Sequence, residues 1–131
     1  MSNGSLHWNL VVAWVWILLG FLFGSVSGLK FQEEKWLGGY ASFKRRLYRL
    51  GHVSFFGLAI INLLFYFTIH LLPQVSVGAT VASWGFIFGA IGMPACCIAT
   101  ASNPNLRVLF IWPIVSLLTA GCLTILEVIK L

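Results

Sequence analysis

The chain has 131 residues, of which 60% are hydrophobic and only 8% are charged. Soluble domains carry about 25% charged residues, so this composition excludes an ordinary soluble enzyme. The formal net charge of +5 comes from basic residues that flank hydrophobic runs, so we expect contact with anionic lipids and none with nucleic acid.

The expected fold is all-α, an integral membrane protein with four transmembrane helices in an antiparallel bundle. A spanning helix needs about 20 residues, so residues 1–131 form one domain with little mass outside the membrane. The predicted spans cover residues 7–29, 50–72, 75–100 and 106–129. No Lys or Arg precedes the first hydrophobic run, so we expect it to be a retained span and not a signal peptide.

The first span contains three glycines that are four residues apart, Gly20, Gly24 and Gly28. Glycines at this spacing line one face of a helix and let another backbone approach closely. We therefore predict that this face forms a helix–helix seam.

The connection over residues 30–49 contains six of the eight basic residues. Beyond Gly38 and Gly39, apolar residues recur at helical spacing, which predicts a short cationic amphipathic helix on the inner membrane surface that runs into the second span. We expect its basic side chains to contact anionic lipid headgroups. An acidic surface of a partner protein is the alternative contact. The side chains in question are Lys44, Arg45, Arg46 and Arg49.

The positions of the basic residues also predict an orientation. Arg107 lies beside the connection 101–106, and only Lys130 lies near the C-terminus. Loops rich in Lys and Arg stay on the cytoplasmic side of a membrane. We therefore expect connections 30–49 and 101–106 in the cytoplasm, both termini outside, and the chain in a bacterial inner membrane.

The second, third and fourth spans contain further packing signals. Gly85 and Gly89 repeat the four-residue glycine spacing in the third span. Asn62 is expected near the membrane midplane, where its amide must find hydrogen-bond partners. Ser116 and Thr119 of the fourth span lie at similar predicted depth and are the expected partners.

Ionisable side chains inside a span are costly and are therefore candidates for function. His52 and His70 share a face of the second span but are 18 residues apart, or about 27 Å, so they cannot bind one haem together. His7 and Glu127 share the outer end with His70, and imidazoles there could bind a metal or a b-type haem. No short ligand spacing supports such a site, so no metal ligand is assigned.

Two prolines, Pro94 and Pro113, lie at similar depth near the inner ends of their spans. Proline tends to kink a helix, and paired kinks could open a cavity beside His52, Met93 and Arg107. Such a cavity would suit a quinone head group or a haem. The simpler alternative is that neighbouring groups satisfy the freed carbonyls, as is common in transmembrane helices.

The leading hypothesis for function is an accessory subunit of a larger, energy-converting membrane complex, with other membrane subunits as partners. The first alternative is electron transfer, with b-type haem or quinone bound at His52, His70 and His7. The second is a small transporter or channel that oligomerises through the glycine face of the first span. The sequence contains no metalloprotease, nucleophile-elbow or P-loop motif, so we assign no catalytic residue.

Overall fold

The computed structural model describes residues 4–131, apart from the side chain of Ser5, and all regular elements in this part are helical. Four α-helices are joined by short connections that contain two 3₁₀ helices. They are α1 (Gly4–Phe31), η1 (Trp36–Gly38), α2 (Phe43–His70), α3 (Val77–Ser102), η2 (Pro104–Phe110) and α4 (Ile111–Ile129). The predicted set of four helices long and apolar enough to cross a membrane is confirmed.

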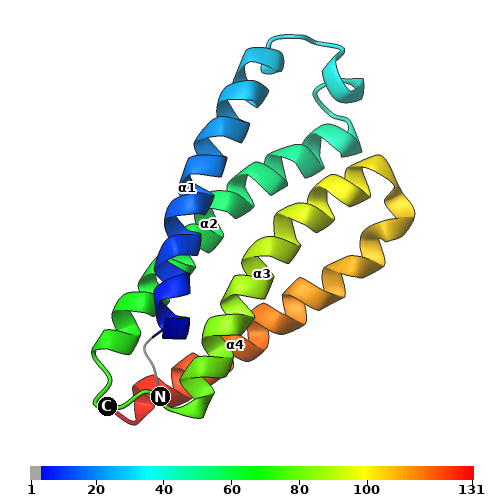
Figure 1. The fold of residues 1–131 in the computed structure, drawn as a ribbon. Coiled ribbons are helices and arrows are strands. Elements are labelled where there is room, and N and C mark those ends of the chain that lie inside the picture. Colours follow the sequence, from blue (N-terminus) through cyan, green and yellow to red (C-terminus); the bar gives the residue numbers. More distant parts are fainter. Residues whose placement is uncertain (1–3) are drawn as a thin grey trace.

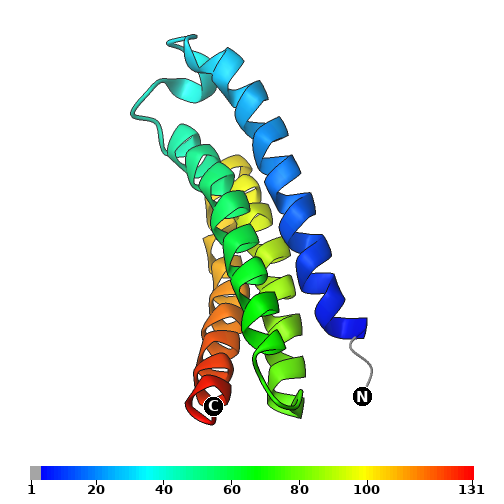
Figure 2. The ribbon, with the colours of Figure 1, turned by 90° about the vertical axis from the view of Figure 1, so that its left-hand side faces the viewer.

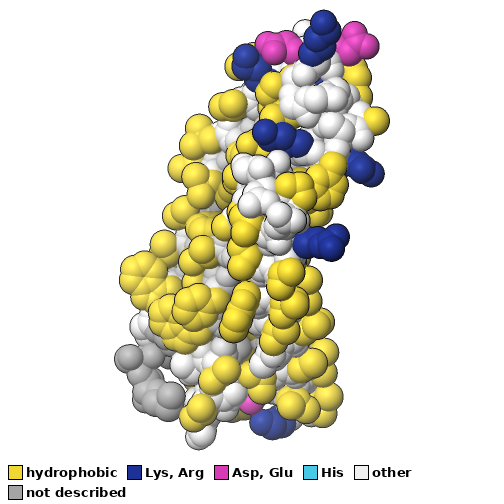
Figure 3. Space-filling model, turned by 90° about the vertical axis from the view of Figure 1, so that its right-hand side faces the viewer, with side chains coloured by type: hydrophobic (Ala, Val, Ile, Leu, Met, Phe, Trp, Pro, Cys, Tyr) yellow, Lys and Arg dark blue, Asp and Glu magenta, His cyan; other side chains and the backbone are white. Residues whose placement is uncertain are grey.

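The two ends of the molecule differ in charge. The start of α1 and the end of α4 lie at one end, which we call the terminal end, and the α1–α2 and α3–α4 connections lie toward the other (Figure 1). We call the latter the basic end, since every basic residue except Lys130 lies in or beside these connections. Figure 3 shows Lys and Arg gathered toward the basic end, with a largely hydrophobic surface below them.

The four helices do not form a closed bundle, because α4 packs mainly on α3. α2 and α4 pack on α3, while α1 crosses α2 and also reaches α3 (Figures 1 and 2). α4 packs mainly on α3, and its buried residues are Pro113, Ala120 and Glu127. These three positions are seven residues apart and therefore form one narrow stripe on the helix. The rest of α4 is left partly or fully exposed.

Small residues set the close approach of α3 and α4. A Cβ atom at Gly85 would lie 2.9 Å from the Cβ of Ala120 and 3.1 Å from the carbonyl oxygen of Ser116. The Ser116 hydroxyl donates a hydrogen bond of 2.8 Å to the carbonyl oxygen of Gly85. A Cβ at Gly89 would collide with the side chain of Leu117. Both glycines therefore lie at the contact between the two helices.

The predicted cationic amphipathic helix is not a separate element, because α2 begins at Phe43 and includes it. Gly38 and Gly39 have φ angles of 85° and 101°, which glycine adopts at little cost, and they turn the chain toward α2. The hydroxyl of Ser42 caps the helix by accepting a hydrogen bond of 3.1 Å from the backbone N–H of Arg45. The basic residues thus form the first two turns of a long helix.

The two prolines whose kinks could open a cavity lie in the packing between α3 and its neighbours. Pro94 and Pro113 are both buried in helix packing. A Cβ at Gly92 would lie 3.0 Å from the Cβ of Pro113, so the missing side chain of the glycine accommodates the proline ring. The two helices are therefore in contact at Gly92 and Pro113, where paired kinks could have opened a cavity.

Candidate functional site

Three fully buried polar residues, Asn9, Asn62 and Ser83, join α1, α2 and α3. The amide nitrogen of Asn9 donates to the amide oxygen of Asn62 at 2.8 Å, and the hydroxyl of Ser83 donates to the amide oxygen of Asn9. The amide nitrogen of Asn62 donates to the carbonyl oxygen of Leu58 at 2.8 Å. We call these three residues the amide network. It ties three helices together with neutral groups.

The partners predicted for Asn62 are therefore wrong, because α1 and α3 supply them and α4 does not. Asn9 was not among the predicted candidates. A signal for it does exist in the sequence, since Asn9, Ala13 and Gly20 recur at helical spacing, and all three are buried on one face of α1.

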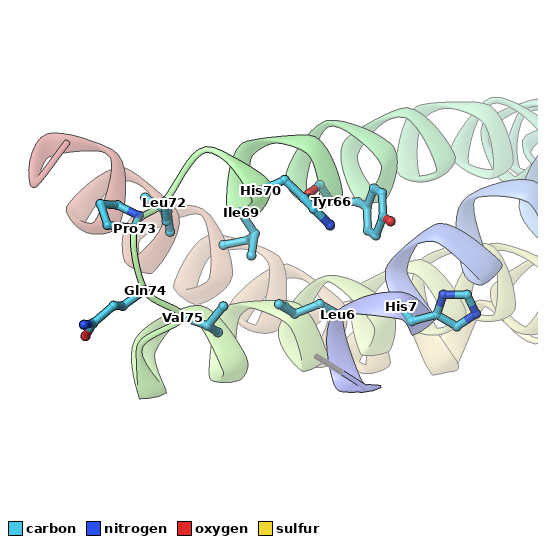
Figure 4. A pocket seen from close by; sticks show the side chains of 9 residues that line it. All are labelled: Leu6, His7, Tyr66, Ile69, His70, Leu72, Pro73, Gln74 and Val75. Atoms are coloured by element: carbon cyan, nitrogen blue, oxygen red, sulfur yellow. Dashed lines mark hydrogen bonds between the residues drawn. The ribbon is translucent and has the colours of Figure 1, made fainter. Parts of the chain in front are cut away.

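A pocket of about 610 Å³ lies at the terminal end. Figure 4 shows His7 on α1 and, across from it, Tyr66 and His70 on α2. The Nδ1 atom of His70 lies 2.7 Å from the carbonyl oxygen of Tyr66. Glu127 does not line this pocket and instead pairs with Lys130 at 3.1 Å. Within residues 4–131, no group of three His, Cys, Asp or Glu side chains is arranged to hold a metal ion.

His52 is part of the contact between α1 and α2. Its Nε2 atom lies 3.1 Å from the carbonyl oxygen of Gly20, and its ring stacks on Phe23 with 6.2 Å between centroids. A Cβ at Gly24 would lie 2.5 Å from the same Nε2 atom. A haem iron bound at Nε2 would have to break the hydrogen bond to Gly20.

A second pocket, of about 300 Å³, lies between α1 and α2 at the basic end. In Figure 1, α1 and α2 diverge toward this end. A Cβ at Gly28 would meet no heavy atom within 4 Å, so Gly28 lines this pocket and does not pack against a second helix as predicted. We call this cavity the arginine pocket. Its polar and aromatic lining includes Ser27, Phe31, Trp36, Arg45, Tyr48, Arg49 and His52.

Arg45 is the most unusual residue of the arginine pocket, because it is only 1% exposed. Its Nη2 group donates to the carbonyl oxygen of Phe31 at 2.6 Å. The guanidinium carbon lies 4.1 Å from the ring centroid of Tyr40, 4.5 Å from that of Phe31 and 5.3 Å from that of Trp36. Three aromatic rings therefore surround the cation.

The hydrogen-bonding capacity of Arg45 is only partly used. Its Nε atom is buried and has no hydrogen-bond partner in the part of the chain described. The ion pairs in this part join Lys30 to Glu33 and Lys130 to Glu127, so none includes Arg45. Arg45 was predicted to contact lipid from the surface, as the exposed Lys44, Arg46 and Arg49 can, but its side chain points inward.

Comparisons of the chain with protein-family models, with curated proteins and with solved structures found no match.

Proposed function

We propose that the four long helices cross a membrane in alternating directions, with the basic end in the cytoplasm and both termini outside, as in a bacterial inner membrane. Two observations support this arrangement. Large apolar side chains are exposed on all four helices, and lipid is the solvent that makes such a surface favourable. Lys and Arg are concentrated toward one end, which is the bias that retains loops in the cytoplasm.

The orientation predicts the behaviour of reporter fusions. Alkaline phosphatase fused after Leu131 is expected to be active, because it folds only outside the cytoplasm, and green fluorescent protein at the same position is expected to be dark. The matched control places each reporter after Asn103 in the α3–α4 connection, where the pattern should reverse. Fluorescence together with inactive phosphatase at the C-terminus would show that the orientation is inverted.

We further propose that the chain is an accessory subunit of a larger, energy-converting membrane complex, in which other membrane subunits cover α4. The observation that carries this proposal is the exposed face of α4. Trp112, Leu118 and Ile125 are 77%, 64% and 60% exposed. The buried residues of α4 are only Pro113, Ala120 and Glu127, with Ser116 and Leu117 also in contact with α3. An aromatic and aliphatic helix face of this kind suits a second membrane protein.

The amide network supports the same role. Asn9, Asn62 and Ser83 bond to one another across three helices, so their polar groups serve packing within the chain. Hydrogen bonds between membrane helices contribute about 0.6–2 kcal/mol each. The network thus holds α1, α2 and α3 together. In the proposed complex, α4 packs on α3 and faces the partner subunit.

Photo-crosslinking tests the subunit proposal. With p-benzoylphenylalanine at Leu118, irradiation of native membranes is expected to give one discrete protein adduct. The ratio of this adduct to the chain should be the same in independent membrane preparations. The matched control places the crosslinker at Ile60 of α2, which is similarly exposed at 61% but belongs to another helix, and lipid adducts alone are expected there. Lipid adducts alone at both positions would contradict the proposal.

A further inference from the structure

We propose that the arginine pocket binds one anionic phospholipid of the cytoplasmic leaflet. The phosphate lies on Arg45 and Arg49, and the first acyl methylenes lie along Gly24 and Gly28. This site rests on the membrane orientation proposed above, and it does not depend on whether a partner subunit covers α4.

The charge of Arg45 is buried and has no acidic side chain as a partner in the described residues. A buried charge is costly unless it is paired with an opposite charge and hydrogen-bonded. The chain has only three acidic residues. The side chain of Glu33 pairs with Lys30 at 3.3 Å, Glu34 is exposed, and Glu127 lies at the terminal end. The carbonyl oxygens of Phe31 and Glu33 accept hydrogen bonds from the guanidinium of Arg45, but no acidic side chain in the described residues pairs with it. An anion from outside the chain would therefore supply the missing counter-charge.

Two arginines of α2 line the cavity together. Arg45 and Arg49 are four residues apart on α2 and both line the pocket, so their side chains lie on one face, about 5–6 Å apart at the Cβ atoms. A phosphate that enters this pocket would face both arginines, and the Nε–H of Arg45 has no partner of its own to give up. Guanidinium groups bind phosphate oxygens through paired, charge-assisted hydrogen bonds.

The opposite wall of the pocket contains small residues. Gly24, Ser27 and Gly28 of α1 line the pocket, and small residues there leave space that larger side chains would fill. A volume of about 300 Å³ accommodates a headgroup phosphate but not two acyl chains. The chains would leave the pocket beside Val53, which is 62% exposed. An ion such as free phosphate would leave this apolar wall uncovered.

The depth of the pocket also fits a phospholipid. Arg45 and Arg49 are two and six residues from the start of α2, or about 3 and 9 Å along the helix axis. In the proposed orientation this region lies at the cytoplasmic headgroup level, where anionic lipids attract basic side chains. Anionic phospholipid headgroups are therefore present at the same membrane depth as the opening of the pocket.

The test is analysis of lipid that remains with the purified full chain. The protein is purified in mild detergent, loaded with phosphatidylglycerol or phosphatidylcholine, washed, and examined by native mass spectrometry. We expect about one phosphatidylglycerol per wild-type chain and no retained phosphatidylcholine. Arg45→Gln should weaken phosphatidylglycerol binding about tenfold or more, since it removes a charge-assisted contact. Arg46→Gln removes the same charge from an exposed neighbour and should bind like the wild type.

A second variant separates loss of binding from loss of folding. Gly28→Leu fills part of the pocket from the α1 side, where an added Cβ atom meets no heavy atom within 4 Å. It should fold normally, as judged by its circular dichroism and elution volume, and still lose phosphatidylglycerol. The proposal would be overturned if Gly28→Leu bound phosphatidylglycerol as well as the wild type, or if Arg45→Gln and Arg46→Gln bound it equally. It would also be overturned if the native extract contained a quinone in place of phospholipid. Displacement of the lipid by inorganic phosphate alone at millimolar concentration would do so too.

Discussion

Replacing Asn62 with Leu is expected to lower the free energy of unfolding by about 1–3 kcal/mol, the cost of leaving buried hydrogen-bonding groups without partners. The substitution removes the acceptor of the 2.8 Å hydrogen bond from Asn9, and it places a branched side chain where an amide was fully buried. The measurement is unfolding of the purified protein in mixed micelles of a mild detergent and sodium dodecyl sulfate.

Thr68→Val is the matched control for Asn62→Leu. Thr68 is on the same helix, and its hydroxyl bonds only within α2, to the carbonyl oxygen of Leu64. Thr68 is half-buried, and because its hydrogen bond lies within one helix turn, this change should alter stability by less than about 0.5 kcal/mol. The double variant Asn9→Leu, Asn62→Leu should cost less than the sum of the single changes, because the two amides are coupled. Equal effects of Asn62→Leu and Thr68→Val would show that the amide network does not stabilise the bundle.

Replacing Gly85 with Leu is expected to separate α3 from α4 and to lower the free energy of unfolding by about 1–3 kcal/mol or more, the usual cost of overpacking. A Cβ at this position would lie within 2.9 Å of the Cβ of Ala120 and 3.1 Å of a backbone oxygen. Neither atom can move away by a simple side-chain rotation. The same unfolding titration measures the effect, and limited proteolysis of the α3–α4 connection reports the separation.

A control variant and a compensating double variant help to explain the effect of Gly85→Leu. Gly121→Leu is the control, since a Cβ at Gly121 meets nothing within 4 Å, and its stability should match the wild type. In the milder variant Gly85→Ala, the second change Ala120→Gly should restore part of the lost stability by removing the closer contact. Wild-type stability of Gly85→Leu would mean that α4 is not held against α3 at this position.

The four helices were predictable because long apolar runs have few alternatives in a chain with so little charge. The basic helix that runs into the second span was also predictable, and α2 begins with it at Phe43. The inward position of Arg45 was not, because its basic neighbours in the sequence are exposed. The connection before α2 depends on Leu37, which adopts a positive φ of 54° that is uncommon for a residue other than glycine. No sequence pattern indicates that this turn folds back over Arg45.

The contacts between helices were only partly predictable. Glycine spacing correctly identifies residues on one helix face, but it does not indicate where along that face the neighbouring helix diverges. Gly20 and Gly24 lie against α2, whereas Gly28 lies where α1 and α2 diverge. The partners of Asn62 depend on the tilt of α1, which brings Asn9 to the same depth. Spacing along one helix contains no information about such a tilt.

The subunit role is tested most directly by an electron cryo-microscopy map of the chain isolated from its native membrane in lipid nanodiscs. The predicted result is protein density, with side chains from another subunit, along the α4 face that includes Trp112, Leu118 and Ile125. A map that shows only lipid around a single copy of the chain would contradict the proposal.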